Sequence, residues 1–86
     1  MHAVVITVTI DDGGAAQQGL EQVVAGVQQA TGFVAGYWIR LDDTHGTSIA
    51  VFETEEQATA NKPPAGTDAP GVRMTNISIG EVLASA

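Results

Sequence analysis

Five polar or aromatic side chains are the candidates for a ligand pocket in this sequence, and they are Tyr37, Trp38, Arg40, His45 and Asn76. Tyr37 and Trp38 are adjacent, so on a β-strand they point to opposite faces of the sheet. Either ring could stack against a planar apolar ligand, or it could simply pack in the core or in an interface. Arg40 shares a face with Trp38 and could bind a ligand carboxylate, or form an ion pair with an acidic group of a second copy. Asn76 falls on the last predicted strand and points either inward or to solvent.

His45 follows the run Asp42-Asp43-Thr44. Histidine titrates near neutral pH, so a carboxylate could orient this ring as a general base. A solvated hairpin turn, held by local hydrogen bonds, explains the same residues. Because adjacent residues of a turn rarely converge on one ion, we expect no metal site here. The run Asp11–Gly14 precedes a helix, and its two aspartates favour an N-cap over an anion site.

The elements that must position these side chains are indicated by a changing hydrophobic period. A period of two is typical of a strand, and an apolar stripe at i, i+4 and i+7 is typical of a helix. The pattern predicts strands over Ala3–Ile10, Phe33–Leu41, Thr47–Glu53 and Val72 to about Val82, and helices over Ala15–Thr31 and from Thr54 to about Asn61 or Lys62.

Local signals refine these predicted elements. Thr54 followed by Gln57 is a capping-box pattern at the start of the second helix. Gly19 and Gly26 each weaken the first helix by about 1 kcal/mol relative to alanine, unless they permit a close approach to the sheet. The stretch Asn61–Gly71 is predicted to be a loop, and Gly80 is expected to mark a bulge or a bend in the last strand.

The order strand, helix, strand, strand, helix, strand predicts one domain over residues 1–86. Two interleaved βαβ units with right-handed crossovers give an α+β, ferredoxin-like fold. In this fold both helices lie on one face of a four-stranded antiparallel sheet.

The sheet face opposite the helices would be left uncovered, because two short helices cover only one face. The first two strands carry apolar groups on both faces, so the open face would expose Trp38, Val34 and Val5, or their counterparts on the other side. A large exposed apolar patch usually marks an interface, which predicts a homodimer that pairs sheet to sheet. A solvated face with scattered apolar residues is the alternative.

Composition excludes several classes of partner. The chain has ten acidic and three basic residues, a formal net charge of -7, and no cysteine. Only Arg40, Lys62 and Arg73 could neutralise phosphates, so we expect neither nucleic acid nor an anionic membrane as a partner. A membrane span needs about 20 apolar residues, and no such run or signal-peptide pattern occurs. A cytoplasmic protein is therefore expected.

A family resemblance rests on the stretch Gly32–Trp38, followed by Gly46, Phe52 and the helix start Glu55–Ala58. The chain resembles the dimeric α+β-barrel superfamily, and within it the antibiotic-biosynthesis-monooxygenase-like domains. This resemblance implies a homodimer, and a cofactor-independent monooxygenase-like enzyme acting on a small hydrophobic or aromatic metabolite. A non-catalytic ligand-binding or stress-response module is the alternative, and a regulatory amino-acid-binding domain is a third.

The resemblance also bears on site residues. Quinone-forming members present Trp, Tyr, Asn and Arg groups around a cavity, and Trp38, Tyr37, Asn76 and Arg40 supply those residue types. None of them is carried over as catalytic. Haem-degrading members have an Asn on the first strand, whereas this chain has no Asn before Asn61. No cofactor is therefore expected.

Overall fold

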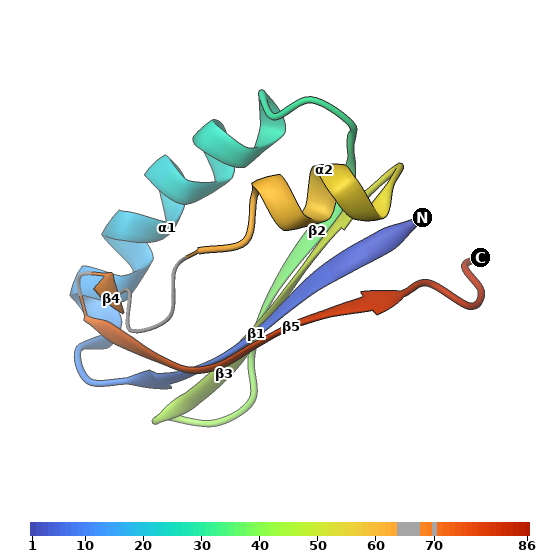
Figure 1. Cartoon of the computed structure of the whole chain (residues 1–86). Helices are drawn as coiled ribbons and strands as arrows, with labels where there is room; N and C mark the ends of the chain where they lie inside the picture. The colour runs from blue at the N-terminus through green and yellow to red at the C-terminus, as the bar shows by residue number, and fades with distance from the viewer. Residues whose placement is uncertain (64–67, 70) are drawn as a thin grey trace.

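The computed structural model of the chain describes residues 1–63, 68–69 and 71–86. The strands are β1 (His2–Ile10), β2 (Phe33–Arg40), β3 (His45–Phe52), β4 (Asp68–Ala69) and β5 (Val72–Glu81), and the helices are α1 (Gly13–Gln28) and α2 (Glu55–Ala60). They form one antiparallel sheet in the order β2-β3-β1-β5-β4, with both helices on the same face (Figure 1). The predicted ferredoxin-like α+β fold is confirmed. No helix of these residues is long and apolar enough to span a membrane.

Most boundaries differ from the sequence-based expectation by one to three residues, and one short strand is added. Helix α1 begins at Gly13, because the Asp12 carboxylate accepts hydrogen bonds from the backbone N–H groups of Gly14 and Ala15. Strand β3 begins at His45, whose carbonyl accepts from Leu41 N–H at 3.0 Å, so the hairpin loop is only residues 41–44. Strand β4 lies within the predicted loop, and residues 64–67 and 70 of that loop are outside the described residues.

The expected bulge at Gly80 is wrong, because Gly80 pairs regularly with Ala3. The register shifts instead at Thr75 in β5 and at Val34 in β2, where one extra residue breaks the alternation of faces. The shift at Val34 places Phe33 on the helix-covered face, whereas unbroken alternation would have placed it on the face of Tyr37.

The hydrophobic core lies under α2. Phe52 and Ala58 are fully buried and Val4 is nearly so, and the Phe33 ring meets Phe52 edge-on at 5.9 Å between centroids. The predicted capping box is present: Thr54 Oγ1 accepts from the N–H of Gln57, and the Gln57 side chain accepts from the N–H of Thr54. This reciprocal cap fixes the start of a helix that is only six residues long.

Helix α1 is held mainly at its two ends. At its start, the carbonyl of Gly71 accepts hydrogen bonds from the N–H groups of Asp11 (2.7 Å) and Asp12 (3.1 Å). Gly71 has a φ of 76°, and a Cβ there would lie 2.3 Å from the Asp12 carbonyl oxygen, so only glycine fits this contact. At its end, Val27 and the following Ala30 reach the core. No residue of α1 is itself buried.

Candidate functional site

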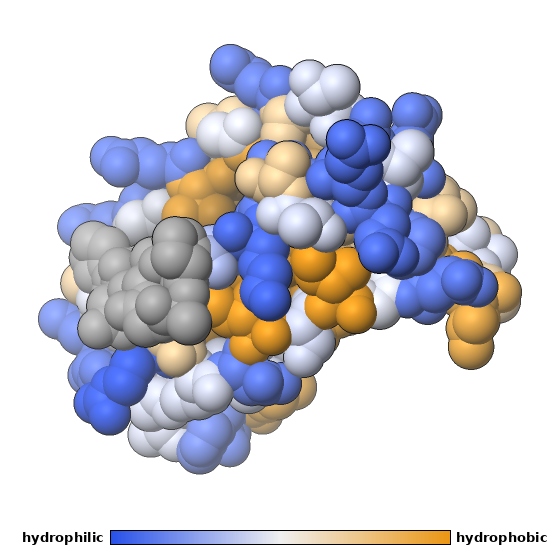
Figure 2. Space-filling model, in the orientation of Figure 1, coloured by the Kyte–Doolittle hydropathy of each residue, from blue (hydrophilic) through white to orange (hydrophobic). Residues whose placement is uncertain are grey.

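A cavity of about 680 Å³ lies between α1 and the helix-covered face of the sheet. Its sheet side is formed by alternate residues of β1 together with residues of β5, namely Val4, Ile6, Val8, Ile10, Val72 and Met74. Figure 2 shows hydrophobic side chains reaching the surface between the helices and the sheet. The lining is mostly apolar, which suits a small hydrophobic ligand.

Small residues on α1 keep this space open. Gly13, Ala16, Gly19 and Gly26 all line the cavity, where larger side chains would fill it. A Cβ built on Gly26 would meet no atom within 4 Å. The expectation of a close approach to the sheet is therefore wrong for Gly26, where α1 faces open space, and it stays a prediction for Gly19.

Trp38 forms a wall of the cavity on β2, and Gly36 determines how its ring lies. A Cβ on Gly36 would lie 2.7 Å from Cη2 and 2.9 Å from Cζ3 of Trp38, and 3.2 Å from Cζ of Phe33. The indole therefore lies over the bare backbone of Gly36, with its six-membered ring toward Phe33. An alanine there would push the indole away from the sheet, because contacts below 3.0 Å are not tolerated.

Arg40 lines the same cavity at the hairpin end of β2. Its Nε donates to the carbonyl of Asp42 and its Nη2 to Oδ1 of Asp43, both at 3.3 Å. Sequence reasoning placed Trp38 and Arg40 on one face, and the structure brings both to the cavity. The sequence patterns did not identify the other polar lining residues, because no local pattern links positions so far apart; these are Gln17, Thr47, Ser48 and Asn61.

Tyr37 and Asn76 lie on the opposite face of the sheet. Tyr37 pairs with Ile49 and is 61% exposed. Asn76 is exposed, and its Nδ2 donates to Oγ of Ser78 at 3.3 Å. The four side-chain types that the family resemblance implies around one cavity are therefore divided between two faces.

His45 belongs to a hydrogen-bonded cluster in the β2–β3 hairpin. Its Nδ1 lies 3.0 Å from Oδ1 of Asp42 and 2.9 Å from Oγ1 of Thr44. The pKa of Asp42 is lowered to about 2, first by the hydrogen bond from the Thr44 backbone N–H and then by His45. The imidazole and the carboxylate are more than half exposed and do not line the cavity, so local hydrogen bonds account for their arrangement.

Among the described residues, no group of three or more His, Cys, Asp or Glu side chains is arranged to hold a metal ion. No protein-family model, curated protein or solved structure matches this chain.

Proposed function

We propose that this protein binds a small hydrophobic or aromatic compound in the cavity between α1 and the sheet. The observation that carries the proposal is the cavity itself, whose volume of about 680 Å³ falls within the usual range for small-molecule sites. Trp38 offers a planar surface for stacking, and Gly36 orients it.

Helix α1 supports this proposal, because the middle of its apolar stripe is left uncovered by the described residues. Leu20 and Val23 both face the cavity, yet neither is buried, and Val23 is 47% exposed. A bound apolar ligand would remove this surface from water, at about 25 cal/mol for each Å² buried. A ligand at 100 times its dissociation constant would stabilise the fold by about 2.7 kcal/mol.

Binding without catalysis is better supported than an enzyme. The described residues that line the cavity include no Asp, Glu, His, Cys, Tyr or Lys that could take a proton from a substrate. A cofactor-independent monooxygenase-like reaction, as implied by the resemblance to dimeric α+β-barrel proteins, is the second candidate. It is favoured by Arg40 beside Trp38, because a guanidinium would stabilise a phenolate or enolate of an aromatic substrate.

A second copy of the chain is the proposed cover for the open sheet face. This face carries a group of apolar side chains around Tyr37 and Ile39, which are 61% and 44% exposed, and it also includes Val5, Ile49 and Val51. Sheet-to-sheet pairing would bury them. We expect sedimentation to show a dimer that Tyr37→Glu dissociates and that Gln22→Glu, on exposed α1 surface, leaves intact. A monomeric wild-type protein at micromolar concentration would contradict the dimer.

A cavity-filling variant tests the binding site. We expect some members of a panel of small aromatic compounds to raise the melting temperature of the wild-type protein. Gly26→Leu should abolish those shifts, because its side chain would enter the open space beneath α1. Ala25→Leu is the matched control, since Ala25 lies on the same helix but outside the cavity. The proposal fails if no compound binds, or if Gly26→Leu binds as well as the control.

A further inference from the structure

The charge of the cavity is opposite to the charge of the protein. The chain has ten acidic residues and a formal net charge of -7. Arg40 is nevertheless the one ionisable side chain among the described residues that line the cavity. If the ten acidic residues were distributed at random over the chain, some of them would be expected in the cavity lining. Among the described residues, the cavity lining therefore offers one positive charge and no negative charge to a ligand.

The contacts of Arg40 leave its guanidinium free to accept a ligand. The side chain is 63% exposed, and its partner Asp43 is 98% exposed, so this ion pair is of the weak, solvent-screened kind. The contacts to Asp42 and Asp43 use Nε and Nη2, while Nη1 takes part in neither. A guanidinium can present parallel N–H groups to both oxygens of a carboxylate. The hairpin thus holds Arg40 in position at the cavity without using its full donor capacity.

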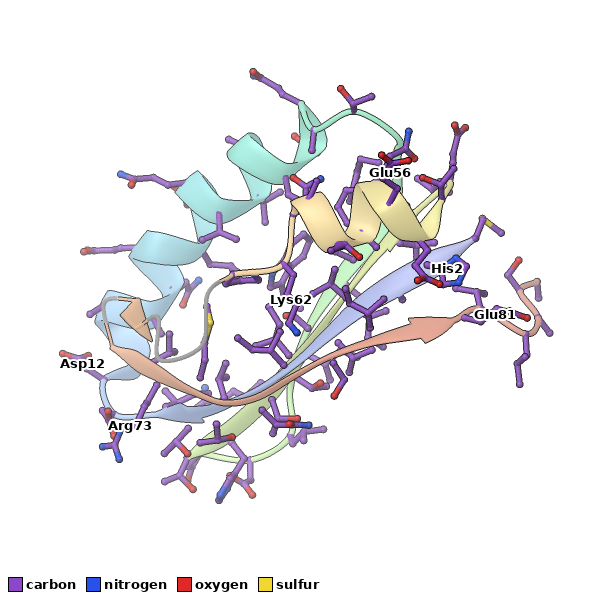
Figure 3. All side chains as sticks on the ribbon, in the orientation of Figure 1. His2, Asp12, Glu56, Lys62, Arg73 and Glu81 are labelled. Atoms are coloured by element: carbon purple, nitrogen blue, oxygen red, sulfur yellow. The ribbon has the colours of Figure 1, made fainter. Side chains whose placement is uncertain are left out.

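Lys62 adds positive charge near another part of the cavity. It follows the lining residue Asn61 and precedes the lining residue Pro63. Figure 3 shows its side chain extending from the end of α2 toward the sheet. Of the three basic residues of the chain, only Arg40 is among the described lining residues, and Arg73 lies 3.7 Å from the carboxylate of Asp11.

We infer that the natural ligand is an amphipathic organic acid, with its apolar body beside Trp38 and its carboxylate on the guanidinium of Arg40. This inference rests on the proposed binding function and adds the chemical class of the ligand. A carboxylate gains charge-assisted hydrogen bonds that a neutral group of the same shape cannot make. A cationic ligand would find no carboxylate among the described lining residues to pair with its charge.

The test compares 2-naphthoate with 2-naphthamide, which have the same shape but differ in charge. Isothermal titration calorimetry at pH 7 should show the wild-type protein binding the carboxylate about 10-fold or more tightly than the amide, as expected for hydrogen bonds to a charged group. Arg40→Gln should remove that preference, so that the variant binds the two compounds with similar affinity. Arg73→Gln is the matched control: it removes the same charge outside the cavity and should keep the preference.

Each outcome has a separate meaning. Equal binding of the two compounds by the wild-type protein would overturn the inference and leave the binding function standing. The inference also fails if Arg40→Gln keeps the preference, or if Arg73→Gln loses it to the same extent, because the effect would then come from overall charge. Failure of both compounds to bind would overturn the proposed function for this ligand class and the inference with it.

Discussion

Helix α2 and helix α1 lie over the same face of one sheet, and they differ in how much side chain each buries. Helix α2 has six residues, and its Ala58 is fully buried against Phe52 and Val4. Helix α1 has sixteen residues and buries none of them. The shorter helix therefore packs against the sheet, whereas the longer helix lies over the cavity.

This contrast divides the molecule into two functional halves. The α2 half contains the buried core and the reciprocal cap of Thr54 and Gln57, so it should carry most of the stability. The α1 half has a stripe of small residues opposite Trp38 and Arg40, so it should carry the binding. Substitutions placed in one half or the other can break this division or sharpen it.

The largest expected effect is the loss of Phe52. Phe52→Ala should lower the free energy of unfolding by about 3–5 kcal/mol, because it leaves a void in the packed half. Val23→Ala in α1 should cost less than about 1 kcal/mol, since Val23 is half exposed and faces the cavity. Urea unfolding measures both. Equal costs for the two substitutions would show that the halves do not differ.

The next effect concerns the indole that borders both halves. Gly36→Ala should cost about 1–3 kcal/mol through overpacking, because its methyl group would collide with Trp38 and Phe33. The displaced indole should enter the cavity and weaken ligand binding. Trp38 is the only tryptophan of the chain, so the shift of its fluorescence reports the displacement directly. An unchanged emission spectrum would contradict this account of the ring position.

A smaller effect, of opposite sign, is expected on α1. Gly26→Ala should raise the free energy of unfolding by about 1 kcal/mol, because alanine favours the helix and the added Cβ meets no atom. Thermal unfolding measures this gain. A loss of stability would show that Gly26 faces a tighter space than the cavity described above.

The smallest effect lies outside both halves, in the β2–β3 hairpin. The pKa of Asp42 is lowered from its ordinary value of 3.8 to about 2, so this carboxylate stabilises the fold above pH 3.8 and loses its contribution as the pH falls toward 2. Carbon-13 NMR of the carboxyl group checks the value. In His45→Ala the pKa should rise only in part, because the Thr44 N–H is the larger cause.

Sequence patterns predicted the elements of this fold because each depends on local chemistry. Asp12 caps α1, and Thr54 and Gln57 cap α2, through contacts within three residues. The register shift at Val34 was not predictable in this way, since it arises from pairing between β2 and β3. Because the sequence alone does not reveal this shift, it does not show on which face of the sheet Phe33 lies.

The candidate site was predictable only in part, because it depends on contacts between segments that are far apart in the sequence. Alternation placed Trp38 and Arg40 on one face, and it separated them from Tyr37. Which face the helices cover depends on the summed burial of four strands, and no single strand reveals it. The cavity depends on a distance between α1 and the sheet, which the spacing of Gly19 and Gly26 does not specify.

The hydrogen bonds from Asp11 and Asp12 to the carbonyl of Gly71 have a consequence for protein engineering. They fix the start of α1 from outside the cavity, while Val27 and Ala30 anchor its end in the core. The middle of the helix can therefore be varied without disturbing either support. A library restricted to Gly19, Val23 and Gly26 is expected to change the ligand that fits while both supports of the helix are kept.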